Sequence, residues 1–426
     1  MITFYNIFLL MGIVLSLPVI VVKVLTDKKK ARLFFRRLGV QGFAHRPATR
    51  PVWVHALSVG EVLASAPLVK KICKLWPGLP VVLSVSTATA HEVAERLLDK
   101  DVTCIFFFPY DLPWSVRRIV RSINPAIFIL IESDIWPNFI YEMNRRHIPF
   151  VLVNGRISPR SFSGYRWVSF FIRHMFSNVS SICTQTEMDA KRFVAVGAPP
   201  EKIQITGNMK FDQPPVFASR EEIHQWRASI GITPGAKVLL AGSTHEGEEA
   251  VLLRCFGALK RKFPDLVLVL VPRDPGRAER IQKMLGQTGC VAPLKTQLAK
   301  MAVRTVPEVI IVDTIGELRR LYAIADVVFV GKSLVDLGGQ NPLEPAALKK
   351  AILFGPHMFN FQPIAEQLVQ QGGALQVANE EDLLHQLRIL LDDADRSAAM
   401  GMEAYKVFQM NRGAVDKTLK VIQEFV

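Results

Sequence analysis

Two glycine-containing turns, each with a carboxylate, mark places where this chain could bind or transform an anion. The first is the segment 58–61, Ser-Val-Gly-Glu, and the second is the segment 338–344, Gly-Gly-Gln-Asn-Pro-Leu-Glu. Glycine lacks a Cβ, so backbone N–H groups and a helix start can approach an anion there. The alternative is a capped helix start, with Asn341 as the N-cap, Pro342 at the first helical position and Glu344 at the third. Because both halves of the chain carry such a turn, we favour a ligand site.

Three charged side chains in the first half have residue types suited to acid–base chemistry. Glu61 follows an apolar run and should lie at a helix start, where the helix dipole favours its ionised form. An ionised carboxylate can accept a proton from an attacking hydroxyl. Glu132 directly ends the apolar run 126–131, and Lys210 follows the run 203–206 by way of Gly-Asn-Met. A glutamate in the first turn of a helix is more often structural. Only the three residues in combination therefore favour a catalytic role.

In the second half, apolar runs end in polar turns of the same kind. Arg273 follows Pro272 after the run 266–271, and a guanidinium can hold a phosphate or carboxylate through two parallel hydrogen bonds. The segment 313–317, Asp-Thr-Ile-Gly-Glu, follows the run 309–312, and its glycine allows a tight backbone turn. Each turn has a structural explanation by itself. Their repeated place after apolar runs favours a common ligand site.

These turns are positioned by apolar runs that alternate with helical patterns along the whole chain. Continuous apolar runs indicate parallel strands covered on both faces. We therefore predict two doubly wound α/β domains, joined near residue 213 and facing each other across a cleft, with ligands beyond the carboxyl ends of the strands. The predicted strands are 52–57, 80–86, 102–108, 126–131, 150–153, 181–185, 203–206, 237–241, 266–271, 309–312, 327–330, 352–354 and 374–377.

Residues 2–22 contain no charged side chain and are about long enough to cross a hydrocarbon core. Basic residues follow this segment, which reverses the order found in a cleaved signal peptide. We therefore predict an uncleaved N-terminal anchor whose basic end stays in the cytoplasm. Gly12, Ser16 and Pro18 weaken the span, so a shallow interfacial helix is the alternative.

The chain is basic, and the charge is concentrated near its start. The formal net charge is +14, and residues 1–50 carry nine Lys or Arg against one acidic residue. Such a segment is attracted to an anionic membrane surface. The segment 156–176 mixes arginines with aromatic residues, a pattern that can also stack nucleic acid bases or form an ordinary amphipathic helix. Because no nucleic-acid-binding module is present, we favour the membrane surface and predict no nucleic acid partner.

Several sequence motifs are absent, and their absence argues against particular classes of enzyme and kinds of metal site. The five cysteines are scattered, which indicates buried thiols in a reducing compartment. Neither GxGxxG nor GxxxxGK[ST] occurs, which argues against a dinucleotide oxidoreductase and a P-loop kinase. No Asp-x-Asp pair ends a predicted strand, and no histidine or cysteine cluster has zinc spacing. We therefore predict neither a metal ion nor a cofactor.

Seven motifs, taken in order, resemble those of the bacterial 3-deoxy-D-manno-octulosonic-acid (Kdo) transferases of lipopolysaccharide biosynthesis. The resemblance covers nearly the whole chain. It implies a GT-B fold, no metal ion or cofactor, and inverting transfer of Kdo from the donor substrate CMP-Kdo to the lipid A precursor lipid IVA. The motifs are SVGE (58–61), ESDIWPN (132–138), GNMKFD (207–212), GSTHEGEE (242–249), PR (272–273), DTIGEL (313–318) and GGQNPLEPA (338–346).

The resemblance also assigns roles to single residues. It makes Glu61 the general base and gives Glu132 and Lys210 the task of stabilising the transition state. Gln340 stands where the family usually has histidine, and the segment 272–277, PRDPGR, stands where it usually has PRHPER, so any difference should lie in the contacts with CMP. The residues that match the CMP-binding segments are Pro272, Arg273, Ile315, Gly316, Glu317, Asn341, Pro342, Leu343 and Glu344.

The resemblance further implies a membrane anchor in residues 1–25, an acceptor-binding domain in 26–212 and a CMP-sugar-binding domain in 213–426. The expected location is the cytoplasmic face of the bacterial inner membrane, with a single-pass or interfacial anchor. The expected partners are CMP-Kdo, lipid IVA and an anionic membrane surface. One alternative is another GT-B nucleotide-sugar transferase or an epimerase. A second is a peripheral membrane protein that senses nucleotide without turnover, but it leaves Glu61 and Lys210 without a role.

Overall fold

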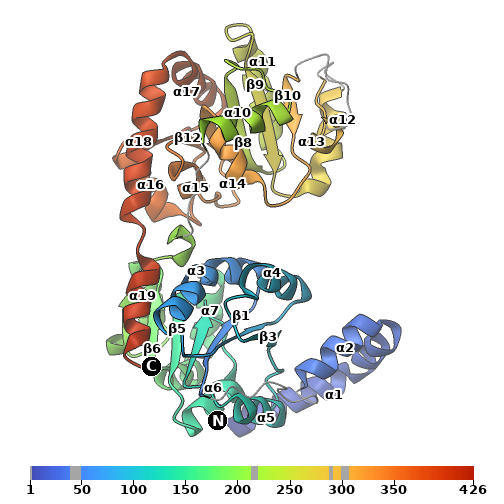
Figure 1. The fold of residues 1–426 in the computed structure, drawn as a ribbon, viewed down its shortest axis with the longest axis vertical. Helices are drawn as coiled ribbons and strands as arrows, with labels where there is room; N and C mark the ends of the chain where they lie inside the picture. Colours follow the sequence, from blue (N-terminus) through green and yellow to red (C-terminus); the bar gives the residue numbers. More distant parts are fainter. Residues whose placement is uncertain (1, 39–48, 213–218, 287–290, 299–306) are drawn as a thin grey trace. The chain divides into compact units, whose positions relative to one another are not determined.

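The computed structural model folds into two compact units, each built on one parallel sheet (Figure 1). The first unit comprises Met1–Gln213 together with Asn411–Val426, and the second comprises Pro214–Met410. The residues that the structure describes are 2–38, 49–212, 219–286, 291–298 and 307–426.

The sheet of the first unit has seven strands in the order β3-β2-β1-β4-β5-β6-β7. Side chains alternate between its faces: Val52 and Val54 pack in the core on one face, and Trp53 packs in the core on the other, where its Nε1 donates to Ser84 Oγ at 2.8 Å. Both faces are therefore buried, as the apolar runs predicted. The strands are β1 (Val52–Ala56), β2 (Val81–Val85), β3 (Cys104–Phe107), β4 (Ile127–Ile131), β5 (Phe150–Gly155), β6 (Ser181–Thr184) and β7 (Ile203–Ile205).

Helices of the first unit connect these strands as parallel crossovers. Two further helices, α1 (Ile2–Thr26) and α2 (Lys28–Arg37), precede the sheet. The connecting helices are α3 (Val59–Leu75), α4 (Ala88–Leu98), α5 (Pro113–Ile123), α6 (Pro137–Arg145), α7 (Pro159–Trp167), α8 (Ser169–Ser177) and α9 (Glu187–Ala195), with 3₁₀ turns at η1 (Pro200–Lys202) and η2 (Met209–Asp212).

The second unit repeats the plan with six parallel strands in the order β10-β9-β8-β11-β12-β13. Its strands are β8 (Val238–Thr244), β9 (Val267–Pro272), β10 (Val309–Ile311), β11 (Val327–Val330), β12 (Ala351–Phe354) and β13 (Ala374–Gln376). Its helices are α10 (Arg220–Ser229), α11 (Glu248–Lys260), α12 (Ala278–Gly286), α13 (Lys295–Leu298), α14 (Leu318–Leu321), α15 (Leu343–Ala346), α16 (Gln362–Gln370), α17 (Glu380–Asp392) and α18 (Ala394–Met410), with 3₁₀ turns at η3 (Pro275–Arg277) and η4 (Tyr322–Ile324).

The predicted fold class is confirmed, because every predicted strand is present and both sheets are doubly wound. In each sheet the order in which strands are added reverses beside the first strand: β1 pairs in parallel with both β2 and β4, and β8 pairs in parallel with both β9 and β11. In open α/β sheets, ligands bind beyond the carboxyl ends of the strands at such a switch point. The turns after β1, β4, β8 and β11 are therefore the ones to inspect.

The C-terminal helix differs from the sequence-based domain scheme, which placed 213–426 in one domain. Helix α19 (Ala414–Gln423) belongs to the first unit, where Val415, Leu419 and Ile422 join the core formed by β1 and α3. The carboxylate of Asp212 accepts hydrogen bonds from Gly413 N at 2.6 Å and Val415 N at 2.5 Å, which caps the helix start. The apolar face of α19 is thus buried against the first sheet rather than the second.

The basic and aromatic segment 156–176 forms α7 and α8. Helix α8 buries Ile172, Met175 and Phe176 in the core, as an ordinary amphipathic helix does, while Phe170 is 77% exposed. Among the predicted buried thiols, Cys183 and Cys255 are buried, and Cys73 and Cys104 are half-buried. Cys290 lies outside the described residues.

Candidate active site

The turn after β1 is held by the side chain of Glu61 itself. Ser58 is the N-cap of α3, and its Oγ accepts a hydrogen bond from Glu61 N at 3.4 Å. In return, Glu61 Oε1 accepts from the Ser58 hydroxyl at 2.9 Å, and Glu61 Oε2 accepts from Leu57 N at 2.7 Å. This reciprocal capping fixes the carboxylate at the carboxyl end of β1.

The pKa of Glu61 is raised to about 7, chiefly by burial and also by the negative charges of Glu132 and Asp134, which together outweigh the hydrogen bonds from Leu57 and Ser58. Only 6% of the residue is exposed. The helix dipole, which was expected to favour the ionised form of Glu61, is opposed by this desolvation. A carboxyl group with a pKa near neutrality is well matched to accepting a proton at neutral pH.

Glu132 directly follows β4 and has a strained backbone conformation. Its φ is +62°, in the left-handed region, while its N–H still donates to Val153 O at 2.9 Å. Such a conformation costs about 1–3 kcal/mol in a residue other than glycine and is found mainly at functional sites. Lys210 Nζ lies 3.0 Å from Glu132 Oε1. Both side chains are partly exposed, so this ion pair adds little stability.

A chain of amide groups positions Lys210 and was missed from the sequence. Asn154, at the end of β5, is fully buried with φ +57°, and its Oδ1 accepts from Met209 N at 3.0 Å. Gln185 Nε2 donates to Asn154 O at 2.9 Å, and Gln185 Oε1 accepts from Asn208 Nδ2 at 3.0 Å. Asn208 Oδ1 then accepts from Lys210 N at 3.0 Å. The signal was available, since Asn154 and Gln185 are polar residues at strand ends.

Replacing Asn154 by alanine is expected to lower kcat by about 10- to 100-fold, because a small displacement of a catalytic group has effects of this size. The loss should appear in kcat rather than in KM for the donor. Asn154→Gly is the matched control, since glycine tolerates the positive φ but lacks the amide. If Asn154→Gly were as active as the parent chain, the amide would have no positioning role.

Asp134 adds a third carboxyl group to this region. Burial raises the pKa of Asp134, and the negative charge of Glu132 adds to the effect. Asp134 does not cap the following helix, because the N-cap position of α6 is Trp136. The segment is instead tied to the turn after β5, where Arg156 N donates to Ser133 Oγ at 3.2 Å. The charges of Glu132 and Asp134 therefore act on the protonation of Glu61 at the switch point of the first sheet.

The corresponding turns of the second unit are joined by a buried carboxylate, Glu248. It accepts four backbone hydrogen bonds, from His245 N at 2.9 Å, Lys332 N at 2.7 Å, Ser333 N at 2.9 Å and Leu334 N at 3.0 Å. The turn after β8 is thereby fixed to the loop after β11. Sequence reasoning noted the motif GSTHEGEE but gave Glu248 no role, because three of the four partner N–H groups lie more than eighty residues away along the chain.

The glycine pair of the loop after β11 packs closely against the chain beyond β12. Gly338 and Gly339 have φ of +96° and +73°. A Cβ on Gly338 would lie 2.3 Å from Asn360 Nδ2, and one on Gly339 would lie 2.3 Å from Met358 Sδ. These glycines are therefore required by tight packing against residues 358 and 360.

Replacing Gly338 by alanine is expected to lower the stability of the second unit by about 1–3 kcal/mol, the usual effect of overpacking. Gly257→Ala in α11 is the matched control, since a Cβ there meets nothing within 4 Å. That change should stabilise the helix by about 0.5–1 kcal/mol. Thermal unfolding of the two variants tests both signs, and equal melting temperatures would contradict the packing argument.

The helix start predicted at Asn341 is displaced by one residue. Helix α15 begins at Leu343, with Pro342 in the N-cap position, and it spans a single turn. Asn341 Oδ1 accepts from Leu343 N at 3.1 Å, an Asx turn that uses the same residue type as an N-cap. Asn341 is therefore not the N-cap, and Glu344 is the second helical residue rather than the third. A single turn is too short to supply the anion site expected of a helix start.

Outside the turn after β10, the predicted nucleotide-binding residues fall into two groups: polar residues whose charges act on one another, and buried apolar residues. Burial raises the pKa of Glu344, while Arg319 in α14, the Asn341 amide and Arg273 after β9 oppose this, so charged groups from separate segments act on one carboxyl. Leu343 is 1% exposed, and Pro272 and Pro342 are also buried, so these residues shape the backbone.

The turn after β10 presents an exposed side chain of its own. Ile315 is 87% exposed, Gly316 has φ +87°, and Glu317 Oε2 lies 2.6 Å from Lys295 Nζ.

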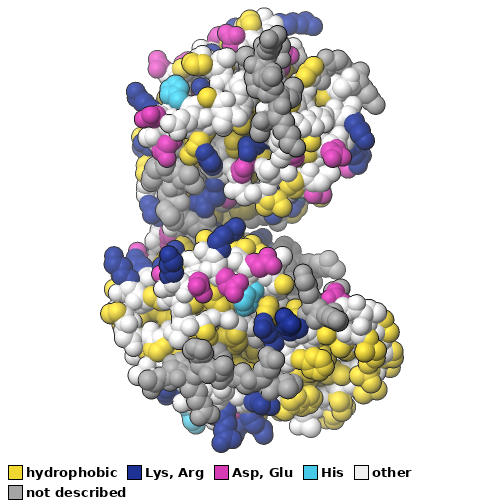
Figure 2. Space-filling view, turned by 45° about the vertical axis from the view of Figure 1, so that its right-hand side comes forward, with side chains coloured by type: hydrophobic (Ala, Val, Ile, Leu, Met, Phe, Trp, Pro, Cys, Tyr) yellow, Lys and Arg dark blue, Asp and Glu magenta, His cyan; other side chains and the backbone are white. Residues whose placement is uncertain are grey.

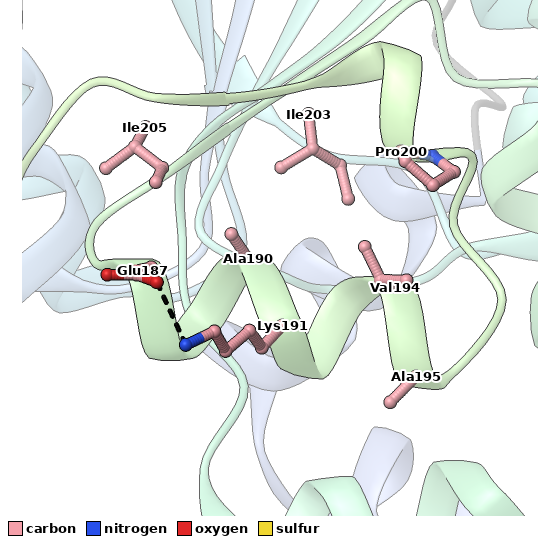
Figure 3. A pocket seen from close by; sticks show the side chains of 8 residues that line it. All are labelled: Glu187, Ala190, Lys191, Val194, Ala195, Pro200, Ile203 and Ile205. Atoms are coloured by element: carbon pink, nitrogen blue, oxygen red, sulfur yellow. Dashed lines mark ion pairs between the residues drawn. The ribbon is translucent and has the colours of Figure 1, made fainter.

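A pocket of about 390 Å³ lies away from these turns, between α9 and β7 (Figure 3). Its lining is mostly apolar, and its one ion pair joins Glu187 Oε1 and Lys191 Nζ at 2.9 Å. The pocket contains none of the predicted site residues, so the candidate chemistry remains at the strand ends.

Comparison with known proteins identifies the family. A sequence profile described as 3-deoxy-D-manno-octulosonic-acid transferase (kdotransferase) matches residues 32–213. The chain is 34% identical to the 3-deoxy-D-manno-octulosonic acid transferase of Haemophilus influenzae, over 92% of this chain and 90% of that protein. This chain belongs to the Kdo transferase family. It is also 31% identical to the transferase of the same name from Bordetella pertussis, over 92% of this chain and 91% of that protein.

A solved structure supports the fold of this Kdo transferase family member. The crystal structure of a glycosyltransferase from Rickettsia africae ESF-5 matches with a TM-score of 0.61 and 14% identity, over 88% of this chain and 99% of that chain. The chain thus has the GT-B architecture of two doubly wound sheets. Family and fold together make it a glycosyltransferase.

Proposed function

We propose that this enzyme transfers Kdo from CMP-Kdo to lipid IVA with inversion at the anomeric carbon, and that it needs no metal ion or cofactor. The observation that carries the proposal is Glu61, a buried carboxyl with a pKa of about 7 beside Glu132 at a sheet switch point. A nucleotide-sugar transferase without a metal needs a base for the acceptor hydroxyl, and Glu61 suits that role. The identity of the sugar is inferred from the names of the relatives, and the identities of the donor and the acceptor are inferred from the family resemblance.

In the proposed reaction, a hydroxyl of the acceptor sugar loses its proton to Glu61 as its oxygen attacks the anomeric carbon of Kdo. A new C–O bond forms while the C–O bond to the CMP phosphate breaks, and the electron pair leaves with CMP. Attack from the side opposite the leaving group inverts the configuration. Lys210, held by Glu132, stabilises charge that develops in the transition state.

The second unit is proposed to bind CMP-Kdo. Arg273 is exposed at the end of β9, where it can pair with the phosphate or the Kdo carboxylate, and the turn at Ile315 and Gly316 presents its backbone to the nucleotide. Within the part of the chain that the structure describes, no group of three His, Cys, Asp or Glu side chains is arranged to hold a metal ion. Cationic side chains are therefore proposed to take the electrostatic role that a metal plays in other transferases.

We also propose attachment to the cytoplasmic face of the inner membrane through α1. This helix has 25 residues and is long and apolar enough for a membrane, by length and composition. The basic residues that follow it suit anionic lipid head groups.

The test is incubation of the detergent-solubilised full chain with CMP-Kdo and lipid IVA, in the presence of a chelator. Mass spectrometry should show Kdo added to the lipid together with release of CMP. CMP should inhibit the reaction, whereas UDP should not. Inhibition by UDP, or loss of transfer on chelation, would contradict the proposed donor or the proposed metal independence, respectively.

A further inference from the structure

The start of the chain forms a hairpin of two helices, α1 and α2, whose first helix is apolar on all sides. Large apolar side chains are exposed along the whole of α1, from Phe4 at 69% to Leu25 at 78%. In Figure 2 they form the hydrophobic surface at the lower right, where α1 lies. A soluble protein rarely leaves such a surface open.

The beginning of α1 is fastened to the body of the first unit by polar contacts. The Tyr5 hydroxyl donates to Asp111 Oδ2 at 3.0 Å, and Asn138 Nδ2 donates to Asn6 Oδ1 at 2.7 Å. The ring of Tyr5 also stacks on Phe171, with centroids 6.0 Å apart. Residues 5 and 6 are thereby held beside α6 and α8.

Asp111 is itself part of the framework of the unit. Its carboxylate accepts from Asn138 N at 3.0 Å and Phe139 N at 2.9 Å, which holds the start of α6. The residue is only 6% exposed. The contact made by Tyr5 is therefore with a fixed group and not with a mobile surface side chain.

The end of the hairpin returns to the same segment. Arg37, the last residue of α2, donates from Nε to Phe108 O at 2.9 Å and stacks its guanidinium 4.3 Å above the ring of Tyr110. Tyr110 N donates back to Arg37 O at 2.9 Å. Both ends of the hairpin are thus attached within residues 108–111.

Because the hairpin is attached at both ends, the orientation that α1 can take in a bilayer is restricted. A helix of this length spans about 37 Å, enough to cross a hydrocarbon core of about 30 Å, but crossing would put its two ends on opposite sides. Here residues 5 and 6 are held at the protein body, and α2, with the sequence KKKARLFFRR, is too basic to enter hydrocarbon. Resting on the membrane attachment proposed above, we infer that α1 lies in the plane of the cytoplasmic leaflet and that the basic α2 rests on anionic phospholipid head groups.

The test places a short epitope tag and a protease site before Met1 of the full chain, in native membrane vesicles. An in-plane helix keeps the tag on the cytoplasmic side, so protease added outside should remove it from inside-out vesicles and not from right-side-out vesicles. The opposite pattern would show a crossing helix and overturn the inference. A chain that does not sediment with membranes would overturn the attachment as well, while transfer to solubilised lipid IVA would still test the chemistry.

A double variant tests whether the polar contacts of Tyr5 and Asn6 hold α1 in the membrane plane. Tyr5→Phe combined with Asn6→Leu removes both polar contacts and frees an apolar helix to cross, so a fraction of the tag should become protected in inside-out vesicles. Leu15→Ala is the control, because Leu15 is 80% exposed, and its tag should be cleaved as in the parent chain. If the double variant were cleaved as completely as the parent, the two contacts would not be what holds α1 in the plane.

Discussion

Replacing Glu61 by glutamine is expected to lower kcat for Kdo transfer by about 10²- to 10⁴-fold, the range that a general base contributes. The change is conservative for the fold. The new side-chain amide can accept from Leu57 N through its oxygen and donate its N–H to Ser58 Oγ, so both capping contacts survive. The measurement is initial rate with CMP-Kdo and lipid IVA at saturation. A variant that retained full activity would remove Glu61 as the base.

The pH dependence of the parent chain gives a second measure of the same group. Because the pKa of Glu61 is raised to about 7, kcat/KM should rise as pH increases through about 7, where the carboxyl loses its proton. The Glu61→Gln variant should lack this limb in its residual activity. An unchanged profile in the variant would assign the limb to another group.

The stability of the fold should depend on pH in the opposite direction to the activity. A carboxyl whose pKa is higher in the folded chain than in the unfolded chain favours folding when protonated, so its contribution is fully present below about 4.5 and is lost as pH rises through about 7. Above that pH the ionised Glu61 destabilises the fold by an amount on the order of 3 kcal/mol. Glu61→Gln should therefore melt at a higher temperature than the parent at pH 8 while losing activity. Equal melting temperatures would contradict the burial of the charge.

The sheets were predictable because their strands are continuous apolar runs, and parallel strands buried on both faces need such runs. The assignment of α19 was not predictable in the same way. Residues 414–423 show an amphipathic helical pattern, but the pattern does not say which of two similar cores receives the apolar face. The cap that Asp212 makes at Gly413 depends on two segments about two hundred residues apart.

The places of the candidate residues were predictable from the sequence, but the contacts that support them were not. Glu61, Glu132 and Lys210 lie after strand ends, as predicted, but the dipole argument for Glu61 ignored burial, which only tertiary structure reveals. Asn341 was taken for an N-cap because N-caps and Asx turns favour the same side chain. Glu248 was passed over since its four donors come from its own turn and from the loop after β11.

Substitutions of Glu132 and of Lys210, which form an ion pair, should shift the pH at which kcat/KM rises (the activity limb) in opposite directions. The negative charge of Glu132 raises the pKa of Glu61, so Glu132→Gln should move the limb to lower pH. Lys210→Met leaves Glu132 without its 3.0 Å partner, so its uncompensated charge should move the limb to higher pH. Asp134→Asn is a second charge-removing variant, and it should shift the limb in the same direction as Glu132→Gln.

Both changes at the pair should also lower kcat, by about 10²- to 10³-fold if Lys210 stabilises the transition state directly. Because both side chains are partly exposed, the melting temperature should change little, which separates loss of chemistry from loss of fold. Lys210→Arg keeps the charge and should keep the limb near its parent position. A shift in the same direction for Glu132→Gln and Lys210→Met would show that Glu132 does not act on Glu61 through its charge, and the proposed arrangement of base and ion pair would then be wrong.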